Sequence, residues 1–257
     1  MNNALLLLRR DNVLKENEHL EPLGKDIRII VSDIHHFSTD TILLSNFACP
    51  KKRDKVIELG TGCGTIPLLM KKDNTNLEIT AVDIQSDACS MLERSVELNK
   101  LDNITVINSD LKELKGKVPF GYFDLVVCNP PYKEDGTGIH NPNDGKKTAR
   151  HEVMCSLEDI IKVSSSLLNF GGRLCMCQRS ERLTDLITLM RKYDLEPKRL
   201  RLVQQRLTKA PKLVLIEGRR GGKSGFMVTE PTLMIEGSDG EFSQEMMEIY
   251  GDYKGNN

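Results

Sequence analysis

Two hydrophobic patterns alternate along this chain of 257 residues. Short apolar runs are typical of buried strands, whereas apolar residues that recur every three or four positions indicate helices with one buried face. Strands are predicted at Lys55–Leu59, Leu77–Asp83, Ile104–Asp110, Asp124–Cys128, Arg173–Cys177, Leu200–Val203 and Leu213–Ile216. Helices are predicted from Ile66 onward and at Phe37–Leu44, Ser86–Asn99, Leu157–Leu168 and Leu183–Met190. Ser38 or Thr39 is placed to cap the first of these helices. The pattern predicts an α/β protein.

The order of these elements predicts how the strands join. Strand–helix alternation favours a mostly parallel sheet with right-handed crossovers. The last two of the seven predicted strands have no helix between them, so one terminal strand should be antiparallel. Residues 13–36 are expected to form a short β-rich segment, with a strand at Ile27–Val31. Because 257 residues can bury one core and no repeat or linker is visible, we expect one domain, with residues 1–36 as an extension and 37–257 as the main fold.

Composition excludes several classes of protein. A hydrophobic share of 39% and a charged share of 28% suit a soluble globular chain. The apolar run Ala4–Leu8 is too short for a signal peptide or a membrane span, so no membrane partner is expected. The seven cysteines are an odd number and lie mostly in apolar runs, without the spacing of a zinc site. We therefore expect a cytoplasmic protein with reduced thiols, no metal and no obligate protein partner.

Charge is unevenly distributed, although the net charge is only −1. Between Arg191 and Lys223 there are eleven Lys and Arg residues against three acidic ones. A basic stretch in a neutral protein is a candidate for binding nucleic-acid phosphates. A solvated face of strands and turns explains the same pattern equally well.

The first strand of the main fold runs into a glycine-rich turn. Glu58 precedes the spacing Gly60-Thr-Gly62-Cys-Gly64, and a helix follows. Glycines at alternate positions let the backbone approach a ligand closely, and the helix start offers free N–H groups. A dinucleotide-binding turn would have its third glycine at position 65, which is Thr65. The turn therefore suits a ligand without a pyrophosphate, and Glu58 suits a cationic group on that ligand.

Acidic residues end the next two strands. Asp83 lies where a carboxylate can accept hydrogen bonds from both hydroxyls of a ribose. Asp110 lies where an adenine amino group can be held. Each acid alone is more often a solvated loop residue or a helix cap. Their regular placement favours a ligand site, because open α/β sheets bind ligands at the carboxyl ends of their strands.

The fourth strand stops abruptly at Asn129-Pro130-Pro131-Tyr132. Two consecutive prolines fix φ and remove two backbone donors, so the strand cannot continue and the turn is rigid. A planar group at this turn would meet the Asn129 amide at its edge and the Tyr132 ring on its face. The alternative is an ordinary turn that ends a strand.

The segment after this turn breaks the alternation of strands and helices. Residues 133–147 contain Gly and Pro but no periodic apolar face, so they are predicted to form a loop. Long loops beside the carboxyl end of a strand often serve as substrate lids. The loop leads to His151, a candidate base, although a single His at a helix start is more often a structural hydrogen-bonding residue.

Together these motifs resemble the Asn-Pro-Pro-Tyr methyltransferases, which use S-adenosylmethionine (SAM), and among them the bacterial valine-tRNA adenine-N6 methyltransferases. The resemblance covers residues from about 20 to 250. Its further segments are Phe37–Leu44, Ala149–Glu152, Arg179–Leu183, Pro231–Ile235 and Phe242–Tyr250. It implies a Rossmann-like class I methyltransferase fold, SAM as the cofactor and a tRNA substrate. It also implies methylation of the adenine immediately 3′ of the anticodon of valine tRNA, position 37.

The resemblance implies roles for individual residues as well. Thr39 and Asp40 would close the methionine end of the SAM pocket. The other expected SAM contacts are Glu58, Gly60, Thr61, Gly62, Cys63, Gly64, Asp83, Ile84, Asp110, Leu111 and Asn129. The expected catalytic residues are Asn129, Pro130, Pro131 and Tyr132. The expected RNA contacts are Lys133, Lys146, Lys147, Arg150, Arg219 and Arg220.

The Asn-Pro-Pro-Tyr turn predicts how an amine is activated. The lone pair of adenine N6 is delocalised into the ring, which makes it a poor nucleophile. If the Asn129 side-chain oxygen and the Pro130 carbonyl accept its two N–H bonds, the lone pair turns toward the methyl donor. Tyr132 would stack on the flipped base. Catalysis then consists of positioning and hydrogen bonding, without a strong base.

Three alternatives stay open at this point. Another RNA adenine, or a glutamine side chain of a protein, is a chemically similar acceptor. The glutamine methyltransferases that act on release factors usually carry a separate N-terminal helical domain, and about 36 residues precede the first predicted helix here. An inactive RNA-binding protein would share the fold, but such proteins typically lose the glycines or the Asn turn, which are intact in this chain.

Overall fold

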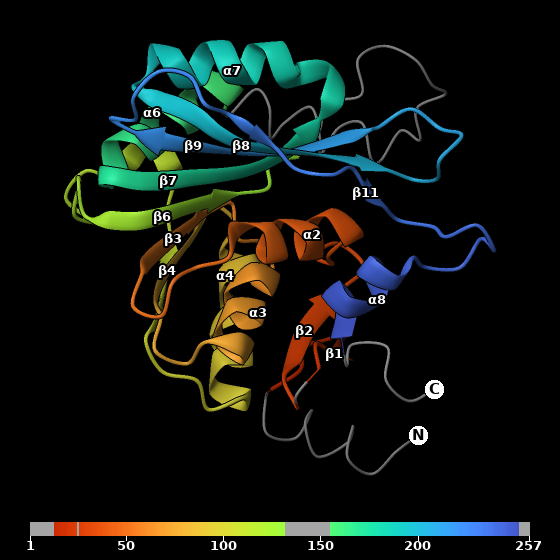
Figure 1. The fold of residues 1–257 in the computed structure, drawn as a ribbon. Coiled ribbons are helices and arrows are strands. Elements are labelled where there is room, and N and C mark those ends of the chain that lie inside the picture. Colours follow the sequence, from red (N-terminus) through yellow and green to blue (C-terminus); the bar gives the residue numbers. More distant parts are fainter. Residues whose placement is uncertain (1–12, 25, 132–154, 252–257) are drawn as a thin grey trace, which may run out of the picture.

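The computed structural model of the chain describes residues 13–24, 26–131 and 155–251. Its centre is a nine-stranded sheet in the order β10-β8-β9-β7-β6-β3-β4-β5, with β11 also paired to β8 (Figure 1). The strands are β3 Lys55–Leu59, β4 Glu78–Asp83, β5 Ile104–Asn108, β6 Phe123–Cys128, β7 Leu168–Arg179, β8 Leu195–Gln204, β9 Leu213–Arg220, β10 Val228–Thr229 and β11 Leu233–Met234. The predicted α/β fold with a mostly parallel sheet is confirmed. The two-residue strands β10 and β11 extend the seven predicted strands.

Helices cover both faces of this sheet (Figure 1). They are α2 Thr39–Ala48, α3 Thr65–Asp73, α4 Ser86–Leu98, α6 Leu157–Leu167, α7 Leu183–Lys192 and α8 Gln244–Tyr250. The helices α2, α3 and α4 pack against one face, and α6 and α7 against the other. Successive strand residues point to opposite faces, so Val56 joins the first core and Ile57 the second. Within the described ranges, none of the helices is long and apolar enough to span a bilayer.

The direction of the strands decides which loops lie together. Among the described strands of the sheet, β9 runs antiparallel to both of its neighbours, β7 and β8, which confirms the predicted antiparallel terminal strand. Because β8 is antiparallel to β9, it runs in the same direction as the parallel strands. The turn between β8 and β9 therefore lies at the edge where β3, β4 and β6 end. We call this the carboxyl edge of the sheet, and the opposite side the amino edge.

Two strands begin earlier than their sequence pattern predicts. The strand predicted at Arg173–Cys177 is the twelve-residue β7, and the strand predicted at Leu200–Val203 begins at Leu195. Gly171, with φ of +81°, and Pro197 interrupt the local strand pattern. A register shift next to Pro197 accommodates the missing N–H in β8. Hydrogen bonds from neighbouring strands, rather than local preference, extend both elements.

The predicted β-rich extension is a hairpin that packs on the main fold. Its strands are β1 Glu18–Pro22 and β2 Arg28–Ser32, and they are antiparallel. The Ile30 N–H donates to Ser95 Oγ of α4 over 3.0 Å. The apolar side chains of β2 are buried in the same core as α2, α3 and α4. Whether the extension and the main fold act as one domain stays a prediction.

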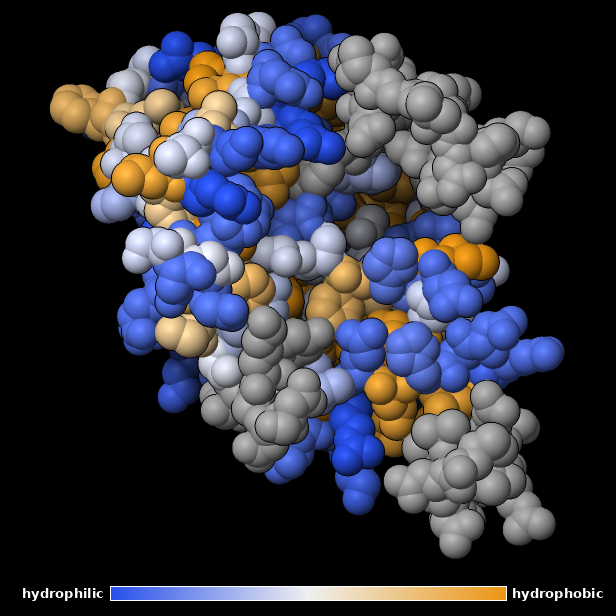
Figure 2. Space-filling view, turned by 90° about the vertical axis from the view of Figure 1, so that its right-hand side faces the viewer, coloured by the Kyte–Doolittle hydropathy of each residue, from blue (hydrophilic) through white to orange (hydrophobic). Residues whose placement is uncertain are grey.

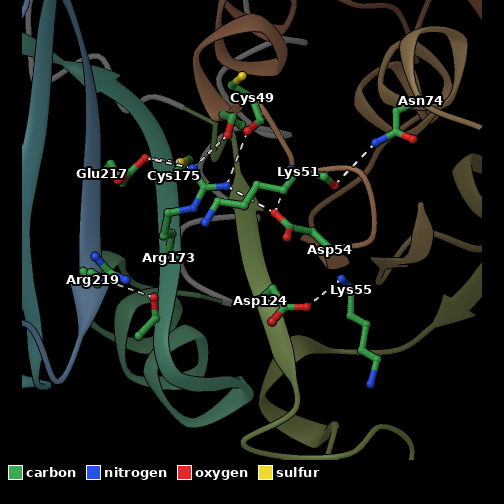
Figure 3. Close-up of polar contacts among 12 residues, drawn as sticks. Cys49, Lys51, Asp54, Lys55, Asn74, Asp124, Arg173, Cys175, Glu217 and Arg219 are labelled. Carbon is green, nitrogen blue, oxygen red and sulfur yellow. Dashed lines mark hydrogen bonds and ion pairs between the residues drawn. The ribbon is translucent and has the colours of Figure 1, made fainter. Parts of the chain in front are cut away.

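Charged side chains toward the amino edge hold the end of α2 (Figure 3). The guanidinium group of Arg173 donates to the carbonyl oxygens of Ala48 and Cys49, over 3.2 and 3.4 Å. It also pairs with Asp54 at 3.3 Å and with Glu217 of β9 at 3.1 Å. The last carbonyl groups of a helix have no partner within the helix, so this network satisfies them and fixes α2 across the sheet.

Candidate functional site at the carboxyl edge

A cavity of about 680 Å³ opens at the carboxyl edge. Its wall combines the start of α2, the glycine-rich turn after β3, the ends of β4, β6 and β7, and the start of α6. The volume lies within the range of sites for small molecules and cofactors. Figure 2 faces the side of the molecule on which β11, α8 and the β8–β9 turn lie, and its surface is hollowed near the middle.

The cavity gathers all of the predicted cofactor residues except Thr39 and Gly64. The Thr39 hydroxyl lies 3.0 Å from the Tyr250 hydroxyl of α8, away from the cavity. Gly64 faces α4, where a Cβ atom would lie 2.2 Å from Leu92 Cδ1. Thr39 and Gly64 therefore lie behind the residues that line the cavity. The cofactor roles of the residues that line the cavity stay predictions.

The glycine-rich turn is held open by Asp83. The Gly62 N–H donates to Asp83 Oδ2 over 2.8 Å, and the Gln85 N–H donates to Oδ1 over 2.9 Å. Gly60 and Gly62 have φ of +76° and +54°, and no atom lies within 4 Å of where their Cβ atoms would stand. A carboxylate offers about four acceptor positions, so Asp83 can also accept bonds from ribose hydroxyls.

Glu58 is buried at the floor of the cavity, with 2% of its surface exposed. Its carboxyl group accepts a short hydrogen bond from the Thr61 hydroxyl. Burial raises the pKa of Glu58 well above its ordinary value, the Asp83 carboxylate raises it further, and the Thr61 bond opposes both. A cationic group in the cavity would favour the ionised form of Glu58.

Asp110 acts as a helix cap and also lies at the cavity, so both interpretations of its position hold. It is the N-cap of a short 3-10 helix, η1 Leu111–Glu113, and its carboxylate accepts the Lys112 N–H over 2.9 Å. Asp110 and Leu111 also line the cavity beside the end of β5. The cap fixes the carboxylate at the cavity wall, so a structural role and a ligand role are compatible here.

The Asn129 amide is oriented by a residue of α2 that sequence reasoning missed. Asn129 Nδ2 donates to Thr41 Oγ1 over 3.0 Å. Thr41 follows the predicted residues Thr39 and Asp40 in the segment 37–44, but no local feature marks it as a partner of the Asn turn. Asn129, Pro130 and Pro131 all line the cavity. The bond to Thr41 holds one N–H of the amide toward α2, and the side-chain oxygen is the atom of the amide that can accept a bond from a target amine.

Two further cavity residues come from the end of β7 and from the short 3-10 turn Ser180–Arg182 that follows it. Gln178 is 6% exposed and lines the cavity, as does Arg182, which pairs with Asp185 at 2.8 Å. The sequence pattern could have identified Gln178. This residue directly follows the fifth predicted strand, and residues at the ends of the four preceding strands were predicted to contact a ligand.

The predicted RNA contacts fall into two groups. Tyr132, Lys133, Lys146, Lys147 and Arg150, together with the candidate base His151, lie outside the described residues. Arg219 and Arg220 end β9 and pair with the first residues of β8, so the structure places them at the amino edge, away from the cavity. Arg219 Nε donates to the Gly171 carbonyl over 3.1 Å, and Arg220 Nη1 donates to the Leu168 carbonyl.

Most of the basic stretch is paired internally. Five of its cations meet acidic side chains, in the pairs Arg191–Glu196, Lys192–Glu158, Arg199–Glu217, Arg199–Glu230, Arg201–Glu245 and Arg206–Glu236. For these residues a structural role in ion pairs within the protein is the better interpretation. In the described ranges no three His, Cys, Asp or Glu side chains are grouped as a metal site would require.

The lining of the cavity fits a nucleoside joined to an amino acid. Asp83 offers acceptors for a ribose, and the buried Glu58 offers a counter-charge for an ammonium group. Apolar side chains of Ile84, Leu111 and Ile160 lie on the remaining wall, where a purine ring can pack. This is the chemistry of SAM, so the residues present fit that cofactor.

Comparison with known proteins identifies the family. Residues 37–192 match the model of the family described as methyltransferase small domain. The chain is 32% identical over 180 residues to a tRNA1(Val) (adenine(37)-N6)-methyltransferase of Parabacteroides distasonis, covering 70% of this chain and 74% of that protein. A protein of the same name from Porphyromonas gingivalis is 28% identical over 222 residues, covering 82% and 85%.

A solved structure shows the same fold. It is described as a predicted O-methyltransferase from Agrobacterium tumefaciens, and it aligns with a TM-score of 0.67 at 18% identity over 83% of this chain and 96% of its own. The glycine-rich turn, the oriented Asn129 and the sequence matches lead to one assignment. This chain belongs to the methyltransferase small domain family and, within it, to the tRNA1(Val) (adenine(37)-N6)-methyltransferases.

Proposed function

We propose that this protein transfers a methyl group from SAM to N6 of an adenine in tRNA, namely adenine 37 of valine tRNA. This is the reaction that the names of the relatives state. The observation that carries the proposal is the Asn129 amide, held by Thr41 at the wall of a cavity that also contains Glu58 and Asp83. An oriented amide beside a nucleoside site is what the methylation of a planar amine requires.

The residues of this chain would hold SAM by its two polar ends. Asp83 and Asp110 would bind the adenosine half, and Glu58 the ammonium group, with Gly60 and Gly62 leaving room for the chain between them. Bound in this way, SAM supplies an electrophilic methyl group. The protein contributes to the reaction by positioning the target base.

Asn129 would position the target amine. With its nitrogen bonded to Thr41, the Asn129 side-chain oxygen accepts one N–H of adenine N6. The Pro130 carbonyl oxygen accepts the other. Pulling both N–H bonds to one side turns the nitrogen lone pair to the opposite side, toward the methyl donor. Because an N–H proton of N6 becomes acidic as the new N–C bond forms and can be lost to water, positioning and hydrogen bonding are sufficient. Stacking of Tyr132 on the flipped base stays a prediction.

The proposal is tested with purified protein, labelled SAM and an unmodified transcript of valine tRNA. We expect single-turnover methylation that mass spectrometry of nucleosides identifies as N6-methyladenosine at position 37. A transcript with guanine at position 37 should receive no label. Label on another adenine would change the target, and label on a protein glutamine but on no RNA would contradict the proposed substrate.

A further inference from the structure

The basic residues of the β8–β9 hairpin are divided between two ends of the molecule. Arg219 and Arg220 lie at its base, on the amino edge. Residues 205–212 form its tip, at the carboxyl edge, where the cavity opens. We call this segment the hairpin tip. It contains Arg206, Lys209 and Lys212 and no acidic residue.

The hairpin tip is attached directly to the wall of the cavity. The Ser180 N–H donates to the Lys212 carbonyl over 3.0 Å, and the Ser180 hydroxyl donates to the Pro211 carbonyl over 2.8 Å. Ser180 lies two residues after Gln178 and two before Arg182, and both of these line the cavity. The hairpin tip therefore lies beside one wall of the cavity, within reach of a macromolecule that delivers a base there.

The conformation of the hairpin tip is fixed from within. Gln204 Nε2 donates to the carbonyl oxygens of Arg206 and Leu207, over 3.0 and 3.1 Å. The Lys209 N–H donates to the Arg206 carbonyl over 2.9 Å. Arg206 also pairs with Glu236 at 3.0 Å, which ties the tip to the segment after β11. A fixed turn presents its charges without a large loss of conformational entropy on binding.

The lysines of the hairpin tip differ from most other cations of the basic stretch; Lys223 is also exposed, but it follows β9 at the amino edge. Lys209 and Lys212 are exposed, and within the described part of the chain neither lies against an acidic side chain. Arg219 and Arg220, by contrast, direct their guanidinium groups to backbone carbonyl oxygens. Figure 2 shows hydrophilic residues gathered over the upper part of the side that contains the hairpin tip. At the carboxyl edge, the charge that the basic stretch offers to a polyanion is therefore at the tip, beside the cavity.

We infer that the hairpin tip binds phosphate groups of the RNA substrate through Lys209 and Lys212, and so docks the tRNA over the cavity. The inference rests on the proposed function, because it takes RNA as the substrate of the same site. Unpaired lysines bind phosphate as point charges and release counterions, so their contribution depends on salt. The base of the hairpin faces away from the site and takes no part in this docking.

The test compares three double variants with the wild-type protein. Lys209→Ala/Lys212→Ala removes the charge of the hairpin tip, and Arg219→Ala/Arg220→Ala removes that of the base. Lys52→Ala/Arg53→Ala is the matched control, because these exposed residues lie just before β3, at the amino edge. Each protein is titrated with unmodified valine tRNA by filter binding between 50 and 200 mM salt, and with SAM by calorimetry.

We expect Lys209→Ala/Lys212→Ala to weaken tRNA binding roughly tenfold at 100 mM salt and to lower the salt slope by about 1 to 2. Its affinity for SAM should equal that of the wild type, which shows that the fold is intact. Turnover at saturating tRNA should change little while KM rises. The control and the variant of the base should keep the wild-type slope.

Two outcomes overturn the inference while the proposed function stands. One is a wild-type slope for Lys209→Ala/Lys212→Ala in a protein that methylates tRNA. The other is a lowered slope for Arg219→Ala/Arg220→Ala alone, which would move the RNA footprint to the amino edge. If the wild-type protein methylates a protein glutamine and neither binds nor methylates tRNA, the proposed function and the inference fail together.

Discussion

The two edges of the sheet use the same kinds of polar side chain in opposite ways. Toward the amino edge, Arg173 pairs with Asp54 and Glu217, so each charge is satisfied within the protein (Figure 3). At the carboxyl edge, Glu58 and Asp83 line an open cavity and keep acceptor positions for a ligand. The comparison shows that the chemical type of a residue does not reveal its role. The end of the strand at which a residue lies decides whether it meets another side chain or faces the cavity.

The largest effect is expected from Arg173→Ala, on stability. The Arg173 side chain is 17% exposed, and its removal takes the donor from the carbonyl groups of Ala48 and Cys49. Among the described residues, Asp54 then keeps only the Lys51 N–H, and Glu217 keeps only Arg199 as its charged partner. Breaking a buried ion pair from one side costs about 3–5 kcal/mol of unfolding free energy. Urea unfolding measures the loss. SAM affinity of the folded variant should stay near that of the wild type, because the change is toward the amino edge.

The exposed Arg53 provides the matched control for this prediction. Arg53→Ala removes the same kind of charge from the same edge, without a buried partner, and should change the unfolding free energy by less than about 0.5 kcal/mol. A loss of under 1 kcal/mol for Arg173→Ala would mean that the network is incidental to stability.

Asn129→Ala should affect the chemical step rather than stability. The substitution removes the oriented acceptor of the target amine and leaves the cofactor side of the cavity unchanged. We expect a loss on the order of 10²-fold or more in single-turnover methylation, as for the deletion of one oriented hydrogen-bonding group in an active site. Binding of tRNA, measured by filter binding, should change little.

Thr41→Val tests the orientation of the Asn129 amide, because it keeps the amide and removes the hydroxyl that holds it. The valine side chain has nearly the same shape but cannot accept the Asn129 N–H. Loss of one such hydrogen bond, about 1.4 kcal/mol, corresponds to a loss of roughly tenfold in the methylation rate. Near-wild-type turnover by Asn129→Ala would refute the mechanism, and a wild-type rate for Thr41→Val would refute the role of α2 in it.

Gly62→Val should weaken the binding of SAM. The space beside Gly62 is open to the cavity, so the new side chain would stand where the cofactor approaches the turn. Overfilling a closely packed contact costs about 1–3 kcal/mol, or roughly 5- to 150-fold in affinity. Calorimetry with SAM measures this.

Gly116→Val is the control for backbone strain. Gly116 also has a positive φ, of +83°, and open space around it, but it does not line the cavity. The Gly116→Val variant should therefore be less stable than the wild type but bind SAM with the same affinity. If Gly62→Val binds SAM as tightly as Gly116→Val does, our placement of the cofactor is wrong.

The smallest predicted effect is the pH dependence given by Glu58. Because burial raises its pKa, Glu58 holds a proton in the cofactor-free protein to a higher pH than an exposed glutamate does. A bound ammonium group favours the carboxylate, so binding of SAM releases this proton. Affinity should rise with pH until the pH exceeds the raised pKa, and then level off.

Glu58→Gln removes this titration and should bind SAM with an affinity that varies little with pH. We expect the wild-type affinity to rise with pH, measured by calorimetry in two buffers of different ionisation enthalpy. The difference between the two buffers reports the released proton. A wild-type affinity that falls as pH rises would contradict the assignment of the ammonium group to Glu58.

Local sequence patterns predicted much of the fold and part of the site. The period of apolar residues located β3, β4 and β6, and the acids and the Asn turn at their ends gave Asp83, Asp110 and Asn129, all of which line the cavity. The prediction of cofactor contacts failed where the position of a side chain depends on a partner distant in sequence. Thr39 bonds to Tyr250 of α8, although its neighbours in the segment 37–44 reach the cavity.

What consecutive residues specify is thus the class of the fold, the order of its elements and the turns at the ends of its strands. Prolines, glycines and the alternation of side chains act within a few residues, so their effects can be deduced from the chain alone. The tertiary structure is needed for everything that depends on strand order. The reversal of β9 places Lys209 at the carboxyl edge and Arg219 at the amino edge, although the two lie in one basic stretch. Contacts such as Thr41–Asn129 join residues that are distant in sequence, and no local pattern encodes them.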